Sequence, residues 1–250
     1  MRLIIDFGNT LSKVALYEND KMLTIGSFSN LTIMSLNAFT NEFLENHNKS
    51  SKISHCIVSS VIDYPIEIQN YLQSNFSFLE LQATSPLPVK IGYKTPGTLG
   101  NDRIAAVIAG NSIFPEQDIL IIDVGTCITY DFLNSKGEYL GGSISPGFNL
   151  RFKALNNYTG KLPLINNFGE TAELIGNSTA NSIKSGVING VKAEVNGIIE
   201  SYIHKYPEIK IIFTGGDVNY FDTTTKNNIF AVANLVLNGL NIILNYNAEN

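Results

Sequence analysis

The chain has 250 residues, enough for one large core or two smaller ones, and 44% of them are hydrophobic, as expected of a globular protein. Only 16% are charged and the net charge is −5, which argues against general nucleic-acid binding because a phosphate backbone requires clustered Lys and Arg. The two cysteines, Cys56 and Cys127, form neither a disulfide framework nor a metal-ligand spacing, so we expect reduced thiols in a cytoplasmic protein.

Neither end of the chain predicts a membrane segment. The N-terminal stretch has a run of three apolar residues directly before Asp6, too few for the apolar core of a signal peptide. Residues 227–248 carry no charge, but asparagines recur there at helical spacing and would lie on one helix face, with leucines off that face. We therefore expect a mostly buried helix rather than a membrane span. The asparagines are Asn234, Asn238, Asn241 and Asn245.

The first half of the chain is predicted to alternate strands with helices. Apolar runs bounded by turn residues predict strands at 1–7, 12–20, 21–28 and 54–61. Helical spacing of apolar residues predicts helices at 37–48, 64–76 and 102–114. The stretch 84–101 is rich in Pro and Gly and predicts a long loop, a place where function is often found.

The second half repeats this order. Strands are predicted at 118–123, 126–134, 138–144 and 210–216, with helical stretches at about 170–204 and near the C-terminus. The matching order indicates an internal duplication with a boundary near Pro115, giving halves at 1–115 and 116–250. We expect a ligand cleft between the halves, as clefts are the usual ligand sites.

The duplication is clearest in two short stretches, LIIDFGNT at residues 3–10 and LIIDVGTC at residues 120–127. In each, a strand delivers an aspartate (Asp6 or Asp123) to a turn whose glycine allows a tight bend and a close approach to a ligand. Exposed N–H groups of such turns suit phosphate oxygens. One Asp-x-Gly alone is most often only a turn, but two matched copies favour a site that grips a polyphosphate from both sides.

The residues of the first copy suggest distinct roles. Asp6 repels phosphate, so its expected role is to hold Mg²⁺ through water. Donors for phosphate follow it, and Lys13 can neutralise phosphate charge; the candidates are Gly8, Asn9, Thr10 and Lys13. A third stretch, KIIFTGGD at 210–217, places Gly215 and Gly216 where adenine and ribose could lie against the backbone, although a glycine-rich turn without a ligand fits the same residues.

The three stretches in this order resemble the actin, sugar-kinase and heat-shock-protein-70 superfamily, whose members bind ATP between two duplicated halves. The resemblance implies an α/β fold of two ribonuclease-H-like halves, with mixed sheets flanked by helices and a cleft between them. A closer resemblance, to type III pantothenate kinases, spans nearly the whole chain. The motifs that carry it are D6-F-G-N-T-x-x-x-K13, Y93-x-x-P96, G100-N-D-R103, D123-V-G-T-x-x-T-x-D131 and G141-G-x-I-x-P-G147, followed by residues 154–163 and 177–186.

This resemblance implies transfer of the γ-phosphate of ATP to pantothenate, the first step of coenzyme A biosynthesis, by a homodimer that needs Mg²⁺ and K⁺ or NH₄⁺. Asp102 would be the general base that accepts the hydroxyl proton, and Arg103 would orient an anionic group. Asp123 matches the ligand of the monovalent cation and Thr126 a contact to ATP. The remaining residues of the implied pantothenate pocket are Tyr93, Gly100, Asn101 and Thr179, the last able to reach the site across the dimer. The role of Asp217 is left open.

Two other interpretations use the same fold. Bvg accessory factor proteins resemble these kinases and are linked to transcription, but the absence of a basic patch speaks against direct DNA contact. Another small-molecule kinase of the superfamily is the second alternative, although sugar kinases usually carry inserted subdomains. The pair Asp102-Arg103 could also be purely structural, as an aspartate at a helix start paired with its neighbour, because a negative charge is favourable there.

Overall fold

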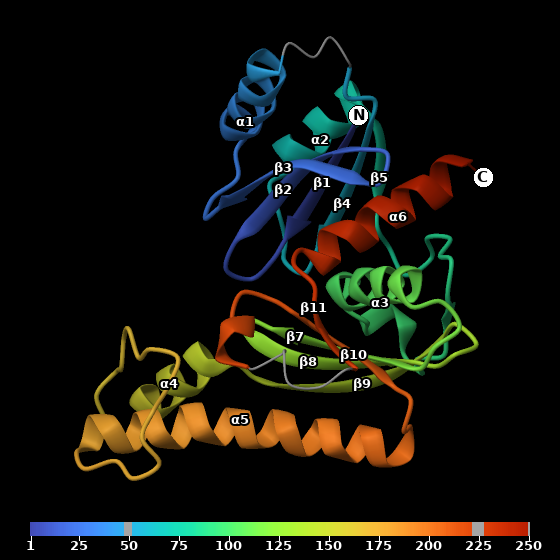
Figure 1. The fold of residues 1–250 in the computed structure, drawn as a ribbon. Coiled ribbons are helices and arrows are strands. Elements are labelled where there is room, and N and C mark those ends of the chain that lie inside the picture. Colours follow the sequence, from blue (N-terminus) through green and yellow to red (C-terminus); the bar gives the residue numbers. More distant parts are fainter. Residues whose placement is uncertain (48–51, 222–227, 250) are drawn as a thin grey trace. The chain divides into compact units, whose positions relative to one another are not determined.

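The computed structural model describes residues 1–47, 52–221 and 228–249, and the chain divides into two compact units (Figure 1). Unit 1 comprises residues 1–113 and 234–250, and unit 2 comprises residues 114–233. These units differ from the predicted halves at the C-terminus, because the last helix packs against elements of unit 1.

Unit 1 is built on a mixed sheet of strand order β3-β2-β1-β4-β5. The pairs β1/β2 and β2/β3 are antiparallel, and β1/β4 and β4/β5 are parallel. The strands of unit 1 are β1 Arg2–Phe7, β2 Ser12–Glu18, β3 Lys21–Phe28, β4 His55–Ser60, β5 Ser77–Glu80 and the short β6 Lys90–Ile91. The helices are α1 Ile33–Asn46, α2 Ile66–Asn75, the 3₁₀ turn η1 Pro96–Thr98, α3 Asn101–Ile113 and α6 Leu235–Glu249.

Both faces of β1 are buried, which is why the strand reads as a continuous apolar run rather than an alternating one. Leu3, Ile5 and Phe7 share a core with residues of α1 and α2. Ile4 points to the opposite face and is fully buried, and α6 contacts β1 and β4. The sheet of unit 1 is therefore covered on both sides, and the end of β1 carries Asp6 out of a rigid core.

The amide face predicted for the last helix is confirmed. Asn238 Oδ1 accepts a hydrogen bond from Tyr17 Oη at 2.6 Å, Asn241 Nδ2 donates to the Asn19 carbonyl at 3.0 Å, and Asn245 lies 3.4 Å from Asp20 Oδ1. The leucines off that face are buried, namely Leu235, Leu237, Leu240 and Leu244. Within the uncharged stretch, residues 229–231 form a strand and the helix begins at residue 235.

Unit 2 repeats the topology of unit 1. Its strands follow the order β11-β10-β7-β8-β9, with β7/β8 and β8/β9 antiparallel and β7/β10 and β10/β11 parallel. Strands β7 to β11 thus correspond to β1 to β5, which establishes the duplication in three dimensions. The elements are β7 Ile119–Val124, β8 Cys127–Leu133, β9 Glu138–Pro146, α4 Phe148–Asn157, α5 Thr179–Lys205, β10 Lys210–Thr214, η2 Val218–Tyr220 and β11 Ile229–Ala231.

Helices α4 and α5 cover one face of the second sheet (Figure 1). Helix α5 begins at residue 179, where the Ser178 side chain caps it by accepting from the Asn181 N–H, so the predicted helical stretch from about residue 170 starts too early. Helix α4 was not predicted, because only Phe148 and Phe152 of its ten residues are buried and the apolar periodicity is short. Among the described residues, no helix combines the length and apolarity needed to cross a membrane.

Candidate functional site

The first aspartate hairpin, residues 6–13, brings a charge pair to the end of β1. Asp6 lies opposite Lys13 on β2 and opposite Ser59 on the parallel strand β4. Side chains at directly paired positions share one face of a sheet, so all three side chains emerge together. Ser59 was missed at the sequence level, because nothing in a buried strand indicates which residue will lie beside Asp6.

Asp6 has an unusual electrostatic environment. Burial is the main cause that raises its pKa from 3.8 to about 6, and the negative charge of Asp102 raises it further, while Ser59 and Lys13 act in the opposite direction. Asp6 Oδ1 and Ser59 Oγ are both buried, and neither makes a hydrogen bond of ordinary geometry within the described part of the chain. Unit 1 therefore holds two carboxylates, Asp6 and Asp102, close enough to repel each other, with a buried oxygen available to a ligand.

Asp102 stands in the first turn of α3. Its Oδ1 accepts the Arg103 N–H at 2.8 Å, which is favourable at the positive end of a helix. The start of the helix is anchored because Asn101 Nδ2 donates to the Leu81 carbonyl at 2.8 Å. At Gly100 a Cβ atom would stand 2.4 Å from Asp102 Oδ1, so only glycine leaves the carboxylate in this position.

The body of α3 is a rigid support for Asp102. Its residues from Arg103 to Gly110 are buried, and the helix packs closely against α6. The contact is backbone to backbone: a Cβ atom at Gly239 of α6 would lie 1.8 Å from the Ala105 carbonyl oxygen. The C-terminal helix thus fixes the element that carries the candidate base.

Two of the predicted pantothenate residues of unit 1, Tyr93 and Arg103, lie close together. The Arg103 guanidinium carbon lies 5.9 Å from the centre of the Tyr93 ring, within the usual range of a cation–π contact. Arg103 is 6% exposed although it is charged. The loop that carries Tyr93 therefore lies against the start of α3, beside Gly100 and Asp102.

The second aspartate hairpin, residues 123–129, is packed against glycines from two other segments. The Gly147 N–H donates to the Thr126 carbonyl at 3.0 Å, and a Cβ atom at Gly147 would lie 2.1 Å from the Gly125 carbonyl oxygen. Thr126 itself is exposed. Gly147 ends the motif G141-G-x-I-x-P-G147 but was not predicted as a site residue. Contact between distant backbone segments leaves no local pattern in the sequence.

The Thr-Gly-Gly turn after β10 contacts the same hairpin. Gly215 has a φ of 102°, and a Cβ atom there would stand 2.2 Å from the Val124 carbonyl oxygen and 2.5 Å from Asp123 Oδ1. The Asp217 N–H donates to the Val124 carbonyl at 3.0 Å. A Cβ atom at Gly216 would meet nothing within 4 Å, so the two glycines differ: one fits the hairpin and the other borders open space.

The predicted pantothenate residues are divided between the two units. Thr179 is the exposed first residue of α5, in unit 2, whereas Tyr93 and Arg103 belong to unit 1. A pocket of about 490 Å³ lies in unit 2 and is lined by residues of β8, β9 and the end of α5, including Phe132, Tyr202 and Lys205, and none of the predicted site residues borders it. The described residues contain no cluster of three or more His, Cys, Asp or Glu suited to a metal ion.

The residues at each hairpin nevertheless fit the expected cations. Mg²⁺ keeps several waters and needs few protein ligands, so the buried Oδ1 of Asp6 beside Asp102 is a suitable anchor that needs no larger cluster. Backbone carbonyls can replace the hydration shell of K⁺, and the Val124 carbonyl and Asp123 Oδ1 both face Gly215. Both sets consist of oxygen atoms, which hard cations prefer.

Comparisons with known proteins agree on one family. The model of the type III pantothenate kinase family matches residues 2–201. A type III pantothenate kinase of Bacteroides fragilis is 45% identical over 248 residues, covering 99% of this chain and 98% of its own, and that of Christiangramia forsetii is 43% identical over 251 residues, covering 99% of each.

Among solved structures, a Campylobacter jejuni protein described as a conserved Baf family transcriptional activator is similar with a TM-score of 0.61 and 20% identity, covering 99% of this chain and 100% of that one. This second likeness is one of fold alone. The predicted fold class is confirmed: the chain has the α/β fold of actin-like ATPases, with two duplicated ribonuclease-H-like sheets flanked by helices.

Proposed function

The chain belongs to the type III pantothenate kinase family, and we propose that it transfers the γ-phosphate of ATP to the primary hydroxyl of pantothenate, giving 4′-phosphopantothenate and ADP in the first step of coenzyme A biosynthesis. The observation that carries this proposal is that unit 1 presents two carboxylates whose charges repel each other, Asp6 at the end of β1 and Asp102 in the first turn of α3. One carboxylate near the phosphates and a second near the acceptor hydroxyl are what a phosphotransferase needs, since catalysis here is mostly positioning and charge neutralisation.

Asp102 acts as the general base in this proposal. The pantothenate hydroxyl oxygen attacks the γ-phosphorus, the bond from that phosphorus to the bridging oxygen breaks, and ADP leaves with the electron pair. The proton of the hydroxyl passes to Asp102, which must lie within hydrogen-bond reach of it. The N–H of Arg103 holds the carboxylate in place, and Gly100 leaves room for it.

The first hairpin binds the phosphates. Asp6 holds Mg²⁺ through water, and the bound ion neutralises the charge that the phosphates share. Lys13 adds a fixed positive charge on the same face of the sheet as Asp6. The turn between them supplies donors from Gly8, Asn9 and Thr10, of which Asn9 and Thr10 are exposed.

The second hairpin and the turn after β10 bind the rest of the nucleotide. Thr126 contacts ATP, and Asp123 holds the monovalent cation, K⁺ or NH₄⁺. Gly215 and Gly216 lie beside adenosine, and the open space at Gly216 supports this placement. Asp217, whose pKa is raised by burial, stays without an assigned role.

Pantothenate is held by the start of α3 and the preceding loop. Arg103 orients an anionic group of the substrate, while Tyr93, Gly100 and Asn101 line the pocket. Thr179 contributes from a second copy of the chain in a homodimer. Leu174 and Ile175, just before Thr179, are 82% and 83% exposed, and such an apolar pair at the surface supports a covered interface.

Two further predictions remain part of the proposal. The chain works as two functional halves, residues 1–115 and 116–250, and its location is the cytoplasm. The duplicated strand order supports the first of these.

The deciding experiment is ADP release by the purified protein with Mg²⁺, measured with and without pantothenate and in K⁺ against Na⁺. We expect release only with pantothenate, and faster release in K⁺. Equal rates with and without pantothenate would reject the assignment and favour another small-molecule kinase or a regulator of the same fold. Mass spectrometry of the product should show one added phosphate on pantothenate.

A further inference from the structure

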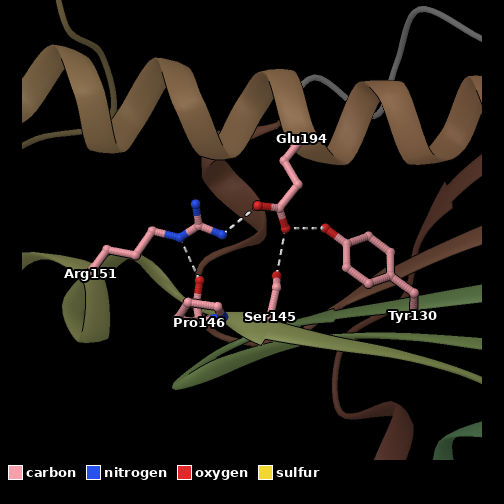
Figure 2. A network of polar contacts seen from close by, with 5 residues as sticks. All are labelled: Tyr130, Ser145, Pro146, Arg151 and Glu194. Atoms are coloured by element: carbon pink, nitrogen blue, oxygen red, sulfur yellow. Dashed lines mark hydrogen bonds and ion pairs between the residues drawn. The ribbon is translucent and has the colours of Figure 1, made fainter. Parts of the chain in front are cut away.

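Glu194 of α5 collects three hydrogen bonds from three separate segments (Figure 2). Its carboxylate accepts from Ser145 Oγ at 2.6 Å, from Tyr130 Oη at 3.2 Å and from Arg151 Nη2 at 2.5 Å. Burial alone would raise the pKa of Glu194, but the hydrogen bonds of Ser145 and Arg151 and the charge of Arg151 outweigh it and hold the pKa below 4.5. The side chain is therefore an ionised acceptor whose bonds are charge-assisted and strong.

The network continues from Glu194 to the backbone that ends β9. Arg151 Nε donates to the Pro146 carbonyl at 2.7 Å while its other nitrogen binds Glu194. Ser145 is held directly. Both residues that precede Gly147 are thus tied to one carboxylate, as the dashed lines in Figure 2 show.

The segment held in this way is the one that packs on the second hairpin. Gly147 donates its N–H to the Thr126 carbonyl and lies against the Gly125 carbonyl oxygen, where no side chain would fit. Ser145, Pro146 and Gly147 offer little apolar side chain for packing. In the β8/β9 ladder Ser145 pairs with Ile128 and Pro146 with Cys127, and Glu194 adds the side-chain contacts that tie this end of β9 to α5.

We propose that Glu194 is a positioning residue for the second hairpin: through Ser145, and through Arg151 and Pro146, it fixes the 145–147 segment against Gly125 and Thr126 and so sets the binding of the nucleotide and the monovalent cation. Its effect on ATP and K⁺ rests on the proposed function, which places ATP at Thr126 and the cation at Asp123. Glu194 contacts no reacting atom in this role.

The test compares Glu194→Gln with Glu200→Gln, a matched change at an exposed position of the same helix. The amide keeps the shape of Glu194 but loses the charge and presents an NH₂ group to either Arg151 or the hydroxyl donors. We expect the KM for ATP and the K⁺ concentration for half-maximal activity to rise about tenfold, the usual cost of losing a partner that orients a ligand-binding group. The KM for pantothenate and the parameters of Glu200→Gln should stay within about twofold.

Calorimetric titration of the nucleotide without pantothenate, in K⁺ and in Na⁺, separates this proposal from the proposed function. A wild type that binds ATP but does not phosphorylate pantothenate would reject the kinase assignment and leave the Glu194 comparison intact. Unchanged ATP and K⁺ affinities in Glu194→Gln would overturn the positioning role, as would an equal rise in the KM for pantothenate.

Ser145→Ala is the second variant in case Glu194→Gln does not fold. It removes one hydrogen bond and leaves the pair of Arg151 and Glu194 in place. A rise of about threefold in the dissociation constant for ATP, with native thermal stability, supports the proposal. An unchanged dissociation constant for ATP in this variant would contradict it.

Discussion

The two aspartate hairpins share a backbone plan but differ in what surrounds the aspartate. Asp6 is paired across the sheet with Lys13 and Ser59, whereas Asp123 is paired with Thr129 and Thr214. The first hairpin thus offers a charged neighbour and the second offers two hydroxyls. In the proposed function, the same fold element therefore serves phosphate and Mg²⁺ in one unit and a monovalent cation in the other.

The turns differ as well. The paired positions that flank the first turn are Asp6 and Lys13, seven residues apart, but Asp123 and Thr129 are six apart, so the first turn is one residue longer. Its extra length leaves Asn9 and Thr10 exposed. The second turn is instead closed in by glycines of distant segments. Duplication has preserved the strand and changed the loop, which is where ligand contacts are made.

The strongest test of this contrast is Asp102→Asn, which removes the base that we place beside the first hairpin. The amide oxygen can still accept the Arg103 N–H, so the helix start is retained. We expect turnover to fall about 10²–10⁴-fold, the usual contribution of a general base, with ATP binding unchanged. The rate of ADP release measures turnover, and calorimetric titration measures the binding of ATP. If Asp102→Asn turned over at the wild-type rate, a group other than Asp102 would have to accept the proton.

The next test addresses the closed packing of the second hairpin. In Gly215→Ala, the alanine must adopt a backbone φ of 102°, and its Cβ atom collides with the Val124 carbonyl oxygen. We expect the free energy of unfolding to fall by about 1–3 kcal/mol and ATP affinity to fall with it. Gly216→Ala, in open space, is the matched control and should stay within about 0.5 kcal/mol. Equal effects of both changes in urea unfolding would contradict the distinction.

The pKa of Asp6 gives a test of the first hairpin that depends on pH. A carboxyl whose pKa is raised from 3.8 to about 6 in the folded state stabilises the fold fully below 3.8, and this contribution is lost as pH rises through about 6. Asp6→Asn is neutral at every pH, so it should be more stable than the wild type at pH 8, by about 1–3 kcal/mol, and nearly equal at pH 4. Urea unfolding at both pH values measures the difference in stability between the variant and the wild type. A difference that does not change with pH would exclude a raised pKa for Asp6.

The smallest expected effect comes from making the two hairpins more alike. Lys13→Thr places in the first hairpin the residue type that faces Asp123 in the second. Loss of one phosphate-binding charge should raise the KM for ATP about tenfold at low salt, and less at high salt because ions screen exposed charges. The KM for pantothenate is the internal control. An unchanged KM for ATP would remove Lys13 from the phosphate site.

The two hairpins and their duplication were predictable, because β1 and β7 are apolar runs that end in the same Asp-x-Gly signal. The motifs also named Asp102, Arg103 and Tyr93, which the structure brings together in unit 1. Contacts between distant segments were not predictable: Ser59 beside Asp6, Gly147 on Thr126 and Glu194 behind both Ser145 and Arg151. Each of these contacts depends on which strands and helices are neighbours in the fold. The spacing of residues within a short stretch of sequence does not predict such neighbours.

The return of α6 to unit 1 also decides the order in which the two units can be completed during synthesis. Residues 1–113 lack the helix that covers β1 and supports α3 until residues 234–250 have been made. The intervening 114–233 takes about 6–24 s to synthesise at typical bacterial and eukaryotic rates of about 5–20 residues per second. Unit 2 is continuous in sequence and can close first, so the unit that begins the chain is the last to finish folding.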